Sequence, residues 1–241
     1  MTSPQIIALG GGVLLPDTGS FELERYILEA SGKSRQRVCF VPTASGDDVS
    51  YVARFEESYA RFGVETDVLR FFGRVPRDLR AYLLEFDVVH VGGGNTRSML
   101  AVWRHWQFDA VLRDAWRRGI VLCGSSAGAI CWFAQGLTDS VADDLTATQG
   151  LGFLAGSNCP HYDGEKDRRP SYRLLVGDGS LAAGLACDDG AGVHFVGETL
   201  HAVVTARPHA GVYRVERTDG NVRETPLSGR LLASTGVTER V

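Results

Sequence analysis

The 241-residue sequence has no run of about 18 uncharged apolar residues, so we expect no membrane span. It also has no excess of basic residues. Lys and Arg number 25 against 29 Asp and Glu, which gives a net charge of −4. Proteins that bind nucleic acids need a basic face to neutralise phosphates, so this balance argues against a nucleic-acid partner.

Cysteine is scarce, and metal-binding motifs are missing. None of the five cysteines forms a CxxC pair, and Cys39, Cys123 and Cys131 lie in apolar stretches typical of buried side chains. There is no HExxH motif and no cluster of His and Cys ligands, so we predict no metal and no other cofactor. Residues 1–4 lack the charged start of a signal peptide, and we expect a cytoplasmic protein.

Over residues 1–135, short apolar runs alternate with amphipathic segments. This alternation is typical of βαβ units and a mostly parallel sheet. We predict strands at 6–9, 38–41, 66–71, 87–91 and 120–123, and helices at 20–30, 51–62, 77–85, 96–103 and 108–118.

The alternation of predicted strands and helices stops after residue 180. Three short strands follow one another without helices, and Asp219-Gly220 is a hairpin-turn signal. The expected strands are 193–196, 200–206 and 212–215. We predict one α/β domain over residues 1–241, with these antiparallel strands added to the parallel sheet or packed beside it. A small separate C-terminal domain is the alternative.

The segment from Gly124 to Gly128 contains the pattern G-x-S-x-G, with Ser126 at its centre. An apolar strand precedes it, and Ile130–Phe133 is expected to begin a helix. A tight strand-to-helix turn of this kind exposes the serine side chain. The free N–H groups at a helix start favour negative charge, and Ala127 is placed to donate to an oxyanion. The sequence therefore predicts that Ser126 is a nucleophile. The alternative is that the glycine-rich turn has no catalytic role and only lets the helix pack close to the sheet.

A nucleophilic serine needs a base and a second oxyanion donor. Among the six histidines, His161 follows an apolar stretch and opens a polar segment, whereas His90 lies inside a predicted strand. The Gly92–Asn95 loop follows a strand and offers free N–H groups. It is not G-x-G-x-x-G, so we do not expect a dinucleotide site. The residues leave the orienting acid open among Asp139, Asp143, Asp144, Asp163 and Glu165.

Three motifs together resemble the dipeptidase E and cyanophycinase family of serine peptidases. They are Gly92-Gly93-Gly94-Asn95-Thr96, the segment Gly124–Ala129, and Pro160-His161-Tyr162. The segment Phe40–Ser45 is also similar, and the resemblance extends over most of residues 5–215.

The resemblance implies a three-layer α/β sandwich like that of class I glutamine amidotransferases. It also implies a serine exopeptidase for short peptides, in particular dipeptides with an N-terminal aspartate. The implied catalytic residues are Ser126, His161 and Asp139, with Asp163 or Glu165 as alternative acids. The implied oxyanion donors are Gly94 and Ala127, and the implied substrate-binding residues are Asn95, Arg169 and Arg173.

Three other functions are compatible with the same strand–turn–helix motif at Ser126. An α/β-hydrolase esterase would place its histidine near the chain end, at His201 or His209. A non-catalytic protein would use the scaffold for binding only, and an amidotransferase-like enzyme would use Cys123. The expected partner is a small peptide substrate, and the oligomeric state is left open, with a homodimer as one option.

Overall fold

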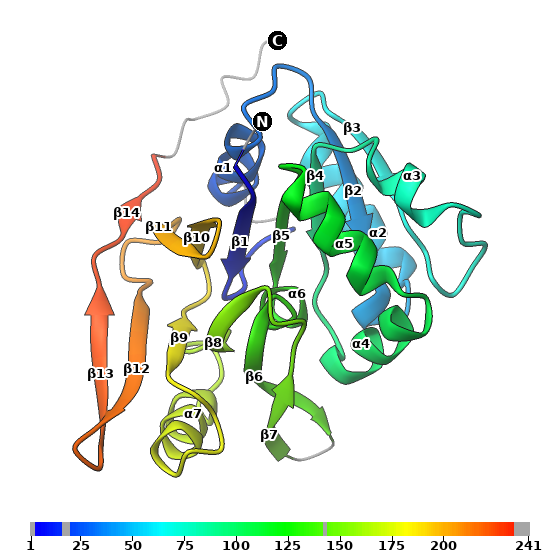
Figure 1. Cartoon of the computed structure of the whole chain (residues 1–241). Coiled ribbons are helices and arrows are strands. Elements are labelled where there is room, and N and C mark those ends of the chain that lie inside the picture. The colour runs from blue at the N-terminus through cyan, green and yellow to red at the C-terminus, as the bar shows by residue number, and fades with distance from the viewer. Residues whose placement is uncertain (1–2, 16–19, 142–143, 234–241) are drawn as a thin grey trace.

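The computed structural model describes residues 3–15, 20–141 and 144–233 (Figure 1). A sheet of eight strands forms its centre. In order across the sheet, the strands are β14 (Arg230–Leu231), β11 (Thr199–Thr205), β10 (Ala191–Val196), β1 (Gln5–Leu9), β5 (Val121–Ser125), β4 (Val88–Val91), β2 (Arg37–Val41) and β3 (Glu65–Val68). The strands from β1 to β3 in this order are parallel, whereas β10 is antiparallel to both β1 and β11. The predicted α/β fold with a mostly parallel sheet is confirmed.

Helices cover both faces of this sheet because its strands alternate their side chains between two cores. In β1, Ile7 and Leu9 join the core beneath α1 (Glu22–Ala30) and α2 (Val49–Ala60). Ile6 and Ala8 join the other core, beneath α3 (Leu79–Leu83), α4 (Thr96–His105) and α5 (Phe108–Arg117). A 3-10 turn, η2 (Thr43–Ser45), connects β2 to α2. These layers match the predicted sandwich.

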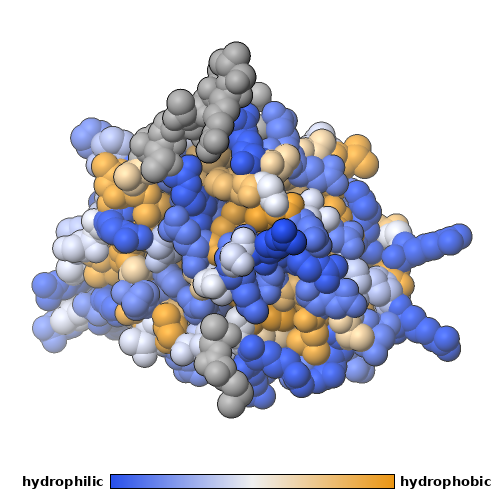
Figure 2. Space-filling view, turned by 90° about the horizontal axis from the view of Figure 1, so that it is seen from above, coloured by the Kyte–Doolittle hydropathy of each residue, from blue (hydrophilic) through white to orange (hydrophobic). Residues whose placement is uncertain are grey.

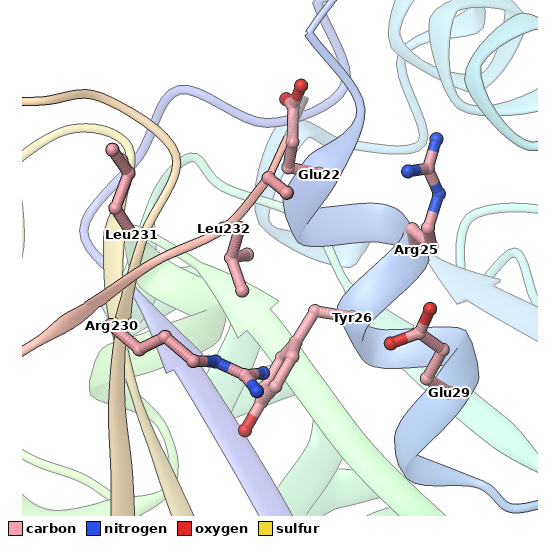
Figure 3. Close-up of a pocket in the computed structure, with 8 residues that line it drawn as sticks. Glu22, Arg25, Tyr26, Glu29, Arg230, Leu231 and Leu232 are labelled. Carbon is pink, nitrogen blue, oxygen red and sulfur yellow. The ribbon is translucent and has the colours of Figure 1, made fainter. Parts of the chain in front are cut away.

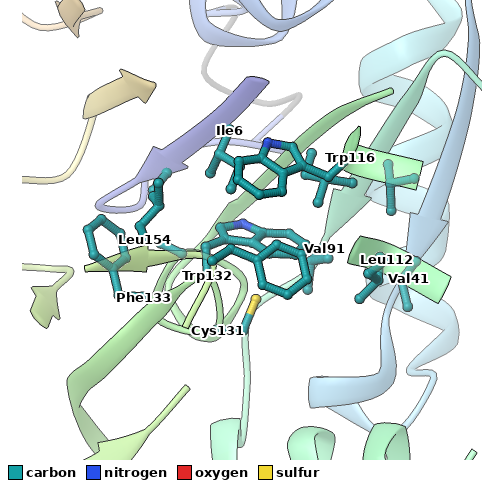
Figure 4. Packing of buried hydrophobic residues seen from close by; sticks show 14 of the residues in the cluster. Ile6, Val41, Val91, Leu112, Trp116, Cys131, Trp132, Phe133 and Leu154 are labelled. Carbon is teal, nitrogen blue, oxygen red and sulfur yellow. The ribbon is translucent and has the colours of Figure 1, made fainter. Parts of the chain in front are cut away.

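The second core contains the largest apolar side chains (Figure 4). Trp132 is fully buried and Trp116 nearly so, and the rings of both pack against Phe153. Removing this much apolar surface from water is the main stabilising contribution expected for a chain of this size.

In the second sheet, the sequence predicted only the strand at 212–215. The strands of this sheet, in order, are β13 (Asn221–Leu227), β12 (Val212–Thr218), β9 (Gly184–Cys187), β8 (Leu154–Cys159), β6 (Phe133–Val141) and β7 (Asp144–Gln149). The prediction that a helix begins at Ile130–Phe133 is wrong about where the helix lies. The helix α6 (Ala127–Ile130) ends at Ile130, and β6 begins at Phe133. A short apolar run does not separate helix from strand by periodicity, and pairing with β7 and β8 decides here.

The C-terminal strands divide between the two sheets. Strand β10 joins the main sheet beside β1, whereas β12 and β13 join the second sheet. The predicted Asp219-Gly220 turn is confirmed, since it connects β12 to β13 with both residues at positive φ. The helix α7 (Arg168–Gly177) packs on the second sheet through Tyr172 and Val176.

Figure 1 shows that the second sheet lies at the end where the parallel strands terminate. Open α/β sheets bind ligands at this edge. The opposite end, seen in Figure 2, presents hydrophobic atoms in small patches among hydrophilic ones. No helix in the described part of the chain is long and apolar enough to cross a membrane.

Candidate active site

Ser126 lies at the sharp turn between β5 and α6. Its φ of 56° and ψ of −119° place it in a conformation that non-glycine residues rarely adopt. A Cβ atom on Gly128 would lie 2.2 Å from the Val91 carbonyl oxygen, so glycine is needed for α6 to approach β4 this closely. The predicted strand–turn–helix context of Ser126 is therefore present.

The end of β1 anchors both Ser126 and His161. The Ser126 N–H donates to the Leu9 carbonyl at 3.3 Å, and the His161 N–H donates to the Gly10 carbonyl at 3.2 Å. His161 also has a positive φ, of 53°, in the turn after β8. Two residues 35 positions apart in the sequence are thus fixed on consecutive carbonyls of one strand end.

The carboxylate bonded to His161 belongs to Asp189, which lies between β9 and β10. His161 Nδ1 lies 2.7 Å from Asp189 Oδ1, and both side chains are partly buried. The hydrogen bond from His161, aided by the charge of Arg207, holds the pKa of Asp189 below its usual value. With Nδ1 held by a carboxylate, Nε2 is the ring nitrogen left to accept a proton. Sequence reasoning did not consider Asp189, although an acidic pair and a glycine directly after the apolar run 184–187 was a usable signal.

Asp139 has a different partner from the one that the resemblance implies. Its Oδ2 lies 3.2 Å from Arg168 Nη2, and Glu165 bonds Arg168 Nε at 2.6 Å. The Arg168 side chain is only 1% exposed, so both carboxylates neutralise a buried guanidinium. Among the other candidate acids, Asp163 accepts the Asp189 N–H, and Asp143 lies outside the described residues.

A cavity of about 550 Å³ separates the β6–β7 hairpin from the turn after His161. It is lined by Asp139, Val141, Asp144, Leu145, Glu165, Lys166, Asp167 and Ser171. Another cavity, of about 320 Å³, lies between α1 and β14 and is lined by Tyr26, Arg230 and their neighbours (Figure 3). None of the predicted site residues lines this second cavity.

Most backbone donors of the loop Gly92–Asn95 are bonded to neighbouring segments of the protein. Three of its N–H groups have acceptors: Gly92 donates to the Val41 carbonyl, Gly93 to the Tyr51 hydroxyl and Asn95 to the Ala44 carbonyl. The Gly94 N–H has no acceptor among the described residues, and the same holds for the Ala127 N–H at the start of α6. A Cβ atom on Gly93 would lie 3.1 Å from Ser126 Cβ, so this loop borders the serine directly.

The predicted substrate-binding residues all have partners within the protein. The Asn95 side chain accepts the Ser98 N–H and donates to the Ser140 carbonyl, which caps α4 and joins it to β6. Arg169 and Arg173 both bond Glu224 of β13, whose side chain is 9% exposed. Although burial opposes it, hydrogen bonds from Tyr162 and the two arginines hold the pKa of Glu224 below its usual value.

The residues needed by the alternative enzymes are arranged differently. Cys123 is completely buried in β5, and burial raises the pKa of its thiol well above the usual value, which disfavours the reactive thiolate. The ring of His201 packs against the ring of His194. All six histidines are described, and His161 is the one with a carboxylate partner.

A sequence profile described as "Peptidase family S51" matches residues 6–203. The chain belongs to peptidase family S51. This S51 peptidase is 46% identical over 228 residues to "Uncharacterized peptidase YgaJ" of Bacillus subtilis (strain 168), and the match covers 95% of this chain and 99% of that protein. The family resemblance read from the sequence and the assignment as a serine-type peptidase are confirmed.

Two solved structures share the fold of this S51 peptidase. A peptidase from an acI-B1 Actinobacterium superposes with a TM-score of 0.69 at 17% identity and covers 94% of this chain and 95% of its own. A putative peptidase E from Listeria monocytogenes EGD-e gives a TM-score of 0.61 at 16% identity, over 83% of this chain and 98% of its own.

Proposed function

We propose that this S51 peptidase is an exopeptidase for short peptides that uses Ser126, His161 and Asp189. The observation that carries the proposal is the 2.7 Å contact between His161 and Asp189, on a turn anchored beside Ser126 at the end of β1. A serine, an imidazole and a carboxylate in this order are the parts that acyl transfer needs.

The proposed reaction follows from what each group is able to do. His161 Nε2 takes the proton of the Ser126 hydroxyl while the oxygen attacks the scissile carbonyl. The Gly94 and Ala127 N–H groups, which have no acceptor in the described structure, donate to the oxyanion. His161 then protonates the leaving amine, and water hydrolyses the acyl-enzyme. Asp189 stabilises the imidazolium throughout.

The proposal replaces Asp139 by Asp189 as the acid. The support is that Asp189 bonds His161, whereas Asp139 and Glu165 bond Arg168. Breaking either carboxylate's contact with the buried guanidinium would affect stability, but it would leave the imidazole with its partner. We therefore assign Asp139 a structural role in the wall of the 550 Å³ cavity.

We also propose a preference for an N-terminal aspartate, as the resemblance implies. Arg169 and Arg173 share one carboxylate, that of Glu224, so the group of three keeps one positive charge. It adjoins Tyr162, the residue after His161, whose hydroxyl donates to Glu224 at 2.7 Å. A guanidinium that retains free donors can bind a carboxylate through two hydrogen bonds.

A panel of dipeptides that differ in the first residue tests both parts of this proposal. We expect release of the first amino acid, fastest from Asp-Xaa, and no release by the Ser126→Ala variant. Equal rates on Asp-Xaa and Ala-Xaa would refute the aspartate preference but would still support exopeptidase activity. Cleavage inside longer peptides only would refute exopeptidase action.

Two remaining expectations stay predictions. A cytoplasmic location is tested by fractionation of the producing cells, and a homodimer by sedimentation of the purified protein. The substrate is proposed to be a peptide small enough to reach Ser126.

A further inference from the structure

The backbone of Asp189 is held on both of its polar groups by side chains from elsewhere in the fold. Its N–H donates to Asp163 Oδ1 at 2.8 Å, and its carbonyl accepts from Arg207 Nε at 2.7 Å. Arg207 Nη2 also donates to Asp163 Oδ2 at 2.6 Å. The three residues therefore close a ring of hydrogen bonds around the peptide that carries the Asp189 carboxylate.

The ring joins three segments that are distant in the sequence. Asp163 lies two residues after His161, Asp189 lies between β9 and β10, and Arg207 follows β11. The Ala206 N–H donates to the Gly190 carbonyl at 2.7 Å, which brings Arg207 over the turn. The ring thus connects the turn that carries His161 to the turn that carries its acid.

Two glycines make room for the Asp189 carboxylate beside His161. A Cβ atom on Gly11 would lie 2.1 Å from its Oδ1, and a Cβ atom on Gly164 would lie 2.5 Å from its Oδ2. The two glycines therefore leave space for the oxygens beside His161, while the ring holds the backbone that carries them.

We propose that Asp163 and Arg207 are positioning residues that hold Asp189 against His161. The inference rests on the proposed function, because the two residues would affect catalysis only through the His161–Asp189 contact. Displacing a catalytic group by about 1 Å can cost on the order of 10²-fold in rate. Arg207 lies beyond residues 6–203, so the family match does not reach it.

A merely structural role would have a different signature. The Arg207 and Asp163 side chains are 51% and 38% exposed, and ion pairs this exposed contribute little to stability. Removing the pair should therefore leave the unfolding temperature almost unchanged. A loss of kcat without a loss of stability is what positioning predicts.

The test compares Arg207→Met, Asp163→Asn and their combination on a dipeptide that the enzyme cleaves. We expect kcat to fall on the order of 10²-fold in each single variant, with KM nearly unchanged. The double variant should fall little further, because both changes open the same ring. Arg207→Lys should not recover the activity, since an ammonium lacks the rigid planar fork whose Nε and Nη2 bond Asp189 and Asp163 separately.

Arg214→Met is the matched control, because Arg214 is an exposed arginine on β12 outside the ring. Wild-type kcat in both single variants would overturn the proposal. A lower kcat that is accompanied by a clearly lower unfolding temperature would also overturn it. The reaction of Ser126 with a fluorophosphonate separates this failure from failure of the proposed function. If Ser126→Ala abolishes labelling and turnover while the ring variants behave as Arg214→Met does, only the positioning role is wrong.

Discussion

Replacing Asp189 by asparagine is the change that most directly tests the proposed chemistry. Asparagine has nearly the same shape, so the ring of Asp163 and Arg207 around its backbone can persist. The carboxylate is ionised at neutral pH, because its pKa lies below the usual aspartate value. The substitution therefore removes one negative charge at 2.7 Å from the imidazole and alters little else.

The expected loss is large because the change alters which ring nitrogen carries the proton. An asparagine amide that turns its NH₂ toward Nδ1 stabilises the tautomer protonated on Nε2. That nitrogen then cannot accept the Ser126 proton. In a Ser-His-Asp hydrolase the same substitution lowers kcat by about 10⁴-fold. This corresponds to about 5.5 kcal/mol of lost transition-state stabilisation at about 1.4 kcal/mol per tenfold.

Asp139→Asn is the matched control. The Asp139 side chain is 58% exposed, and Arg168 keeps its 2.6 Å bond to Glu165. We expect kcat within a few-fold of wild type and a stability loss of about 0–1 kcal/mol.

Steady-state hydrolysis of a cleaved dipeptide and thermal unfolding measure both variants. The reasoning is refuted if Asp189→Asn turns over normally while Asp139→Asn is inactive and folded. That result would return the acid to the position implied by the family resemblance.

Three further changes test other parts of the site and the core. Ser126→Ala should lower kcat by on the order of 10⁴-fold or more with the unfolding temperature retained, and normal turnover would exclude the serine mechanism. Tyr51→Phe removes the acceptor of the Gly93 N–H and should lower kcat about tenfold at unchanged KM by loosening the loop that carries Gly94; a change in KM alone would contradict this. Burial raises the pKa of Glu24 from 4.5 to about 7 in the folded state. The stability linked to Glu24 is therefore complete below about pH 4.5 and is lost as the pH rises through about 7. Glu24→Gln should remove this dependence and stabilise the protein by up to about 3 kcal/mol at pH 8, as urea unfolding at pH 5 and pH 8 would measure; equal effects at both pH values would contradict it.

The sequence determined those features that depend on neighbouring residues. The alternation of apolar runs and amphipathic helices specifies a parallel sheet covered on both faces, since each element needs its own buried side. The turn that carries Ser126 lies between Gly124 and Gly128, so its strand–turn–helix geometry follows from the size of neighbouring residues. Local residues also singled out His161 as a candidate base, because it begins a polar segment at the end of an apolar one.

Only the tertiary structure decided which acid meets His161. Asp189 lies 28 residues farther along the chain and reaches the imidazole because β10 pairs with β1, which brings the turn before β10 to the end of that strand. Charge and position in the sequence left several acids open, and the family resemblance implied Asp139, yet the fold commits Asp139 to the buried Arg168. The pairing of Arg169 and Arg173 with Glu224 likewise depends on β13 lying beside α7. Contacts of this kind have no local pattern, since they arise where two sheets meet and each charge must find a partner.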